Sequence, residues 1–189
     1  MQGRRSLPYL AMTDSSSEKT LRNVLTISVI DGWSVTLFAG FCTLVSLAFG
    51  EWIGVYIGGL ITASGVMGLH GRRKLLRGDA NGMNGLVRAQ VVILATIGLY
   101  AFRNLLAFDE ATIMEGLTSE MRTVLDQYGI STDTLRAMLK PVYYGFYLVV
   151  IGLTLLFQGG LALFYHSRKA KVSEALAARQ PAPPALPTV

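Results

Sequence analysis

Charged residues are scarce in this chain of 189 residues. They make up 15% of the sequence, whereas hydrophobic residues make up 51% and the mean hydropathy is +0.44. A typical soluble domain carries about 25% charged residues. Apolar runs near twenty residues long account for the difference, and such runs match the thickness of a bilayer. The composition therefore excludes an ordinary soluble domain and predicts an integral membrane protein.

Cysteine and catalytic motifs are also scarce. Cys42 is the only cysteine, so a disulfide or thiol–disulfide chemistry within the chain is excluded. The sequence contains no HExxH or CxxCH motif, and the glycine-rich stretch 78–85 lacks the Lys-Ser/Thr of a phosphate-binding loop. We therefore expect no cofactor and assign no catalytic residue. The net charge of +5 does not point to nucleic acid, because the basic residues flank apolar runs, where membrane threading accounts for them.

Four apolar runs predict an all-α fold, a four-span transmembrane helical bundle. We place the spans at about 33–49, 52–71, 87–108 and 142–165, within a single transmembrane domain covering residues 17–171. Residues 1–16 and the Pro- and Ala-rich residues 172–189 are expected to be disordered. Between spans three and four, residues 109–140 form a short external segment with helix starts at Thr118 and Ser131. Pro141 either kinks one continuous helix or begins a new one.

Residues 17–30 have the pattern of a short amphipathic helix, with Leu21, Val24 and Leu25 on one face. We expect this helix to lie in the membrane interface, followed by a break at 31–34 where Asp31 caps the first span. The alternative makes Asp31 an intramembrane carboxylate and hence a functional residue. Counting back from Phe49 places Asp31 at the interface, which favours the cap. Met12 is a plausible translation start, and an intact mass that includes residues 1–11 would exclude it.

The basic residues predict the threading. They are concentrated in the N-terminal arm, in the loop between spans two and three, and in the C-terminal tail, whereas the segment 109–140 is rich in acids. By the positive-inside rule both termini are cytoplasmic and 109–140 is external, in a plasma membrane or, in a prokaryote, the inner membrane. The basic residues assigned to the cytoplasmic side are Arg4, Arg5, Lys19, Arg22, Arg72, Arg73, Lys74, Arg77, Arg88, Arg168, Lys169, Lys171 and Arg179.

The second span is unusually rich in glycine. Small residues recur at helical spacing along one face, and in lipid such a face allows two helix backbones to approach closely. We expect this face to be a helix-packing surface, with its partner either in the same chain or in another protein. Its residues are Gly54, Gly58, Thr62, Gly65 and Gly68.

Three further groups of residues are candidate sites. Ser64, Thr96 and Gln158 are expected at one depth, either as hydrogen-bonding contacts between helices or as a polar lining for a solute path. Asp31, His70 and His166 are expected near the cytoplasmic interface; a metal site there is disfavoured because no motif spacing supports it. The third group contacts anionic lipid headgroups and consists of Arg72, Arg73, Lys74 and Arg77.

The sequence favours a structural or accessory membrane subunit without enzymatic activity. Its expected partners are the lipid bilayer and either a second copy or another membrane protein, bound through the glycine face. The alternative is a small transporter or channel subunit that uses the Ser64, Thr96 and Gln158 layer. A proton-coupled exporter would need an acidic residue deep in its first span, which the interfacial placement of Asp31 does not provide. A weaker alternative is an enzyme that acts on lipid through His70 and His166.

Overall fold

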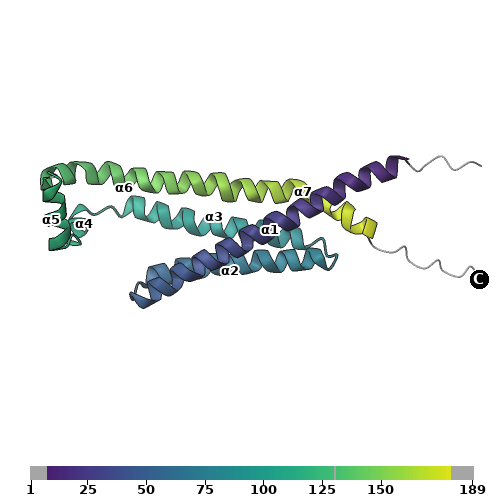
Figure 1. The fold of residues 1–189 in the computed structure, drawn as a ribbon, viewed down its shortest axis with the longest axis horizontal. Helices are drawn as coiled ribbons and strands as arrows, with labels where there is room; N and C mark the ends of the chain where they lie inside the picture. Colours follow the sequence, from purple (N-terminus) through teal and green to yellow (C-terminus); the bar gives the residue numbers. More distant parts are fainter. Residues whose placement is uncertain (1–7, 130, 180–189) are drawn as a thin grey trace, which may run out of the picture. The chain divides into compact units, whose positions relative to one another are not determined.

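The computed structural model describes residues 8–129 and 131–179, and every regular element in them is helical. Four helical stretches are long and apolar enough to cross a membrane, which confirms the expectation of a multi-pass, all-helical protein. They cover Ser16–Ala48, Trp52–Leu76, Gly82–Leu106 and Thr132–Arg179. The elements, shown in Figure 1, are α1 (Pro8–Ala48), α2 (Trp52–Leu76), α3 (Gly82–Leu106), α4 (Glu110–Glu115), α5 (Ser119–Gln127), α6 (Thr132–Thr154), a π-helical turn η1 (Leu155–Gly159) and α7 (Gly160–Arg179).

The described chain divides into two compact units, and the single domain expected from the sequence stays a prediction. The first unit takes in the chain up to Leu94 and from Gln158 onward, and the second is Ala95–Phe157. The first unit therefore holds α1, α2, the first half of α3 and α7. The second holds the other half of α3, the helices α4 and α5, and α6.

The helix α1 is continuous from Pro8 to Ala48, so the expected break at 31–34 is absent. Asp31 lies inside this helix and caps nothing, and Ser34 donates its hydroxyl to the Asp31 carbonyl within the same helix. The prediction of a separate interfacial helix over 17–30 is wrong for the same reason. Leu21 and Val24 are fully buried, in contact with other helices of the first unit. Protein, and not lipid, covers the apolar face of this segment.

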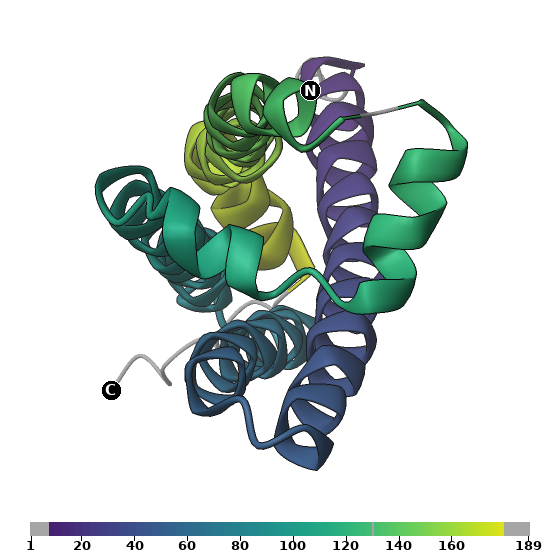
Figure 2. The same ribbon diagram turned by 90° about the vertical axis from the view of Figure 1, so that its left-hand side faces the viewer.

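The glycine-rich face of α2 packs against α1 (Figure 2). A Cβ added at Gly58 would lie 3.3 Å from the Thr43 Cα, and one at Gly65 would lie 3.0 Å from the Thr36 nitrogen and 3.2 Å from the Gly32 carbonyl oxygen. Such approaches leave no room for a side chain, so the glycines allow the two helices to meet backbone to backbone. The remaining residues of this face are placed alongside: Gly54 against Ser46, Thr62 beside Gly40, and Gly68 against Ala89 of α3.

The turn between α2 and α3 depends on a second glycine contact. A Cβ added at Gly71 would lie 2.8 Å from the Gly82 carbonyl oxygen and 3.1 Å from the Leu86 nitrogen, and one at Gly82 would lie 2.9 Å from the Leu75 nitrogen. All of these neighbours are backbone atoms, which cannot move aside as a flexible side chain can. The start of α3 therefore rests directly on the end of α2.

A hydrophobic core joins the four helical segments of the first unit at the end where the basic residues gather. In α7, Val172, Ala175 and Leu176 are buried, so the prediction of a disordered tail is wrong for residues 172–179; residues 180–189 lie outside the described residues. Two polar contacts hold α7 to α1, since Ser17 donates to Glu174 over 3.0 Å and Arg179 pairs with Glu18. Residues 8–16 form the start of α1. The buried core residues are Leu21, Val24, Leu75, Met83, Leu86, Tyr165, Val172, Ala175 and Leu176.

In the second unit, side-chain caps start the helices between α3 and α6. Thr118 accepts a hydrogen bond from the Met121 N–H and Ser131 accepts one from the Thr134 N–H, as the sequence predicts. Asp109 caps α4 in the same way, through the Ala111 N–H. Pro141 lies within the uninterrupted helix α6, which excludes a new helix beginning there.

Aromatic side chains join α6 to the end of α3 within the second unit. The ring centroid of Tyr143 lies 5.0 Å from that of Phe108 and 4.9 Å from that of Tyr147. The Tyr143 hydroxyl also donates to the Asn104 carbonyl oxygen over 2.9 Å. Tyr143 therefore contacts protein through both its ring and its hydroxyl.

Candidate functional site

The carboxylate of Asp31 meets the amide of Gln90 inside the first unit. The Gln90 Nε2 donates a hydrogen bond to the Asp31 Oδ2, and Gln90 is only 1% exposed. Asp31 itself is partly buried. At ~1.5 Å per residue, residues 31 to 48 span ~26 Å, within the ~30 Å hydrocarbon core measured from the end of α1. Asp31 thus lies within the candidate span Ser16–Ala48, and this distance still puts it near the interface, as the sequence indicates.

Tyr165 of α7 belongs to the same neighbourhood. Its side chain is fully buried, and its hydroxyl has no hydrogen-bond partner among the described residues. Tyr165 belongs to the core cluster that contains Leu86 of α3 and against which Ile27 of α1 packs, and these two residues lie one helical turn before Gln90 and Asp31. We call Asp31, Gln90 and Tyr165 the polar triad; it draws on α1, α3 and α7.

The sequence reasoning missed Gln90 and Tyr165. A signal was present in the spacing of α3, because Met83, Leu86, Gln90 and Ile93 recur at intervals of three and four and therefore share one face. A lone amide on an otherwise apolar face indicates a buried polar partner.

The expected cluster of Asp31, His70 and His166 does not form a metal site. The residues described by the structure contain no group of three or more His, Cys, Asp or Glu side chains able to hold a metal ion. His166 is exposed because its neighbour Tyr165 points into the core, and successive helical residues point about 100° apart. His70 is likewise exposed, next to the buried Gly71.

The predicted polar layer is divided between the two units. Ser64 is 3% exposed and donates to the Leu60 carbonyl oxygen over 2.8 Å, so its hydroxyl is already used within α2. Gln158 lies in the π-helical turn η1, and its Oε1 is buried without a hydrogen-bond partner in residues 8–129 and 131–179. Thr96, 9% exposed, belongs to the other unit, so a shared layer remains a prediction.

The basic group after the second span is placed at the end of α2. Arg73, Lys74 and Arg77 are exposed. Arg72 is partly buried, and its Nε donates to the Leu25 carbonyl oxygen over 3.3 Å. Arg72 therefore joins α2 to α1, and the contact of the other three with lipid headgroups stays a prediction.

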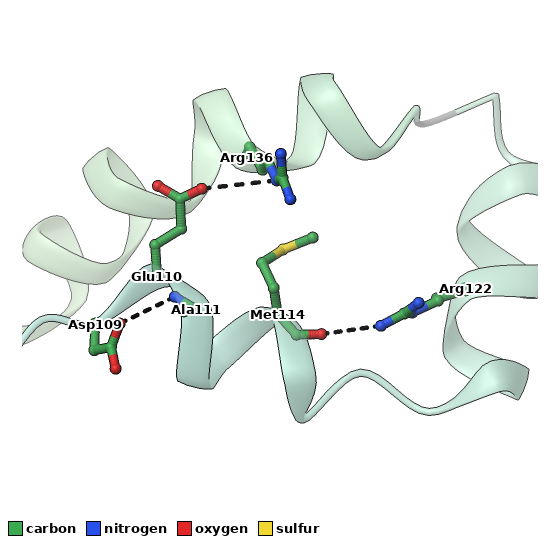
Figure 3. Close-up of polar contacts among 6 residues, drawn as sticks. All are labelled: Asp109, Glu110, Ala111, Met114, Arg122 and Arg136. Atoms are coloured by element: carbon green, nitrogen blue, oxygen red, sulfur yellow. Dashed lines mark hydrogen bonds and ion pairs between the residues drawn. The ribbon is translucent and has the colours of Figure 1, made fainter.

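A cavity of about 380 Å³ lies in the second unit between α4, α5 and the start of α6. Its charged lining is balanced, with Glu115 and Asp126 against Arg122 and Arg136. Figure 3 shows how local contacts hold this region: Arg136 pairs with Glu110 at 3.7 Å, and Arg122 donates to the Met114 carbonyl oxygen over 3.2 Å. The arginines thus have structural partners nearby.

Similarity to known proteins adds nothing to these observations. No protein-family model, no curated protein and no solved structure matches this chain.

Proposed function

We propose that this chain is an integral membrane protein with both termini in the cytoplasm and the α4–α5 segment outside. The concentration of Lys and Arg around the loop 77–81 and in the two terminal regions supports this threading. An even number of spans also brings the termini to one side. A reporter enzyme fused to the C-terminus should be active only in the cytoplasm. Activity of that fusion only on the outer side would refute the threading.

We further propose that the protein is a structural or accessory membrane subunit, without enzymatic activity, that presents α5 to a protein partner. The observation that carries this proposal is the exposed apolar face of α5. Met121 is 54% exposed, Val124 48% and Tyr128 79%, although α5 lies outside the four candidate spans. An apolar helix face outside the membrane is typical of an association surface. The glycine face of α2, in contrast, is already covered by α1.

The test compares two single variants on the same helix. Val124→Asp places a charge on the apolar face of α5, whereas Thr123→Asp places one at a neighbouring exposed position. Native mass measurement in mild detergent should find the wild-type chain in a complex, with itself or with a co-purified protein. Val124→Asp should dissociate that complex, and Thr123→Asp should leave it intact. A wild-type chain that is monomeric and free of bound protein would exclude the accessory role.

A small transporter or channel subunit is the second candidate, and the Asp31–Gln90 pair favours it. Carboxylates inside membrane spans commonly mark ion pathways. The π-helical turn that contains Gln158 adds support, because π-turns are frequent at functional sites. Ion flux into proteoliposomes that is lost in Asp31→Asn and kept in Asp109→Asn would establish this function. Absence of flux for small monovalent ions and protons would exclude it for these ions.

A further inference from the structure

The polar triad brings oxygen atoms from three helices into the interior of the first unit. Gln90 is 1% exposed and Tyr165 is 0% exposed, so both side chains are enclosed by protein. The Asp31 carboxylate accepts a hydrogen bond from Gln90, and Tyr165 lies in the core cluster one helical turn away. The three side chains come from positions 31, 90 and 165, so only the folded chain assembles them.

The charge of Asp31 has no basic partner in the part of the chain that the structure describes. The ion pairs found there are Glu18 with Arg179 and Glu110 with Arg136. A carboxylate withdrawn from water needs a counter-charge, a bound cation or a proton. Arg72, the partly buried arginine of this region, uses its Nε on the Leu25 carbonyl oxygen.

Two buried oxygen atoms of the triad are also unsatisfied. The Gln90 Oε1 and the Tyr165 hydroxyl oxygen have no hydrogen-bond partner among the described residues. Buried polar atoms are nearly always paired, so two unpaired oxygens near a carboxylate that has no counter-charge among the described residues require an explanation. Rotating the Gln90 amide by 180° exchanges the positions of its Nε2 and Oε1 atoms. The Oε1 atom would then face Asp31.

We propose that Asp31, Gln90 and Tyr165 form a binding site for one monovalent cation of the sodium or potassium class. One carboxylate balances one positive charge, and carboxylate, amide carbonyl and hydroxyl oxygens are the donors that hard cations prefer. A proton on Asp31 is the competing occupant, since a carboxyl O–H can donate to the Gln90 Oε1 and the Tyr165 O–H can donate to Asp31. That occupant would make stability depend on pH and not on a cation. A cation can use all three side chains at once. This site is independent of the accessory role proposed for α5.

The experiment measures thermal unfolding of the full chain in detergent at constant ionic strength. Trp33 and Trp52 serve as fluorescence reporters. Sodium chloride or potassium chloride should raise the midpoint in a saturating manner relative to N-methylglucamine chloride, because a ligand bound only by the folded state stabilises it. Asp31→Asn should lose this shift, and Tyr165→Phe should need about tenfold more cation. Asp109→Asn, which changes a carboxylate of the second unit, should keep the shift.

If a variant fails to fold, a direct binding measurement on the wild-type protein still tests the proposal. Radioactive sodium or rubidium, the latter standing in for potassium, should bind to wild-type protein at one ion per chain. Equal stability in all three salts together with no bound ion would overturn the proposal. An Asp31→Asn protein that folds and still shows the cation shift would overturn it as well, as would stability that depends on pH but on no cation.

Discussion

Several single glycines of the first unit lie in direct contact with the backbone of a neighbouring helix. The neighbours of Gly71 are the Gly82 carbonyl oxygen and the Leu86 nitrogen, which are fixed by the helices that carry them. At Gly54, by contrast, the nearest neighbour is the Ser46 side chain, which can rotate. The cost of a methyl group therefore depends on whether backbone or side chain faces the glycine.

We expect Gly71→Ala to lower the free energy of unfolding by about 1–3 kcal/mol, the usual cost of overpacking. Gly59→Ala is the matched control, because a Cβ there meets nothing within 4 Å. This control should be neutral or stabilising by up to about 1 kcal/mol, since alanine favours the helix. Unfolding in mixed micelles of increasing denaturing detergent measures both variants. Equal stabilities would show that the contact between α2 and α3 is looser than described.

The surroundings of the helix α1 are determined by the helices that pack against it. Its N-terminal half has an apolar face that suits the membrane interface, yet α7 and the α2–α3 turn bury that face. The same segment then continues without a break into the span that packs against the glycine face of α2. The helix α1 is therefore the common partner of α2 and α7.

Truncation of Leu21 tests this role of α1. Leu21 is 0% exposed, whereas Leu37 on the same helix is 64% exposed. We expect Leu21→Ala to destabilise the protein by about 2–5 kcal/mol through the lost core contact. Leu37→Ala should change stability by less than about 0.5 kcal/mol. If Leu21→Ala weakened only membrane association, an interfacial helix would be the correct description.

The short helix α4 depends on the charge of its cap. Hydrogen bonds from the Thr112 hydroxyl and the Ala111 N–H lower the pKa of Asp109 below its usual value. A lowered pKa in the folded state means that the ionised cap stabilises α4 above the unfolded pKa of about 3.9, and that this contribution is lost as the pH falls through the folded value. Helical chemical shifts of α4 should decline in that acidic range. Asp109→Asn, which keeps an acceptor oxygen but does not titrate, should remove the pH dependence.

On the scale of the whole molecule, the outer surfaces of the long helices are apolar and uncovered. Large hydrophobic side chains such as Phe38, Phe41 and Leu44 are 66–74% exposed. Such surfaces require lipid, because exposed apolar patches of this kind are rare on soluble proteins. Cys42 lies on this part of α1 and is exposed.

Labelling of the Cys42 thiol tests whether lipid covers this face of α1. In lipid nanodiscs a water-soluble maleimide should fail to label Cys42, because the surrounding acyl chains exclude the reagent. The control is a Cys42→Ala, Asn81→Cys variant, whose thiol lies at an exposed position in the turn between α2 and α3 and should label readily. Similar labelling rates for the two proteins would show that this face of α1 is in water.

The local elements were the most predictable part of the fold. Thr118 and Ser131 start helices where the sequence places them, because a capping side chain acts on backbone groups two or three residues away. The number of long helices was predictable for a related reason. Apolar runs of about twenty residues in lipid must satisfy their own backbone hydrogen bonds, and a helix does so within one segment.

The burial of α1 and α7 was not predictable, because an amphipathic pattern is the same whether lipid or protein covers it. Leu21 becomes a core residue only through contacts with residues such as Tyr165 and Leu176, far along the chain. The sequence alone also left open which helix meets the glycines of α2, because spacing defines a face and not its partner. Only the fold placed α1 there.

The composition and apolar runs of the sequence determined that this protein is helical, multi-pass and built on four long apolar helices. Tertiary structure alone decided the position of Asp31. The residue expected to cap a span lies within a continuous helix and accepts a hydrogen bond from Gln90, 59 positions away. Local sequence determines which segments are helical, whereas the environment of a side chain depends on distant segments that only the folded chain brings together.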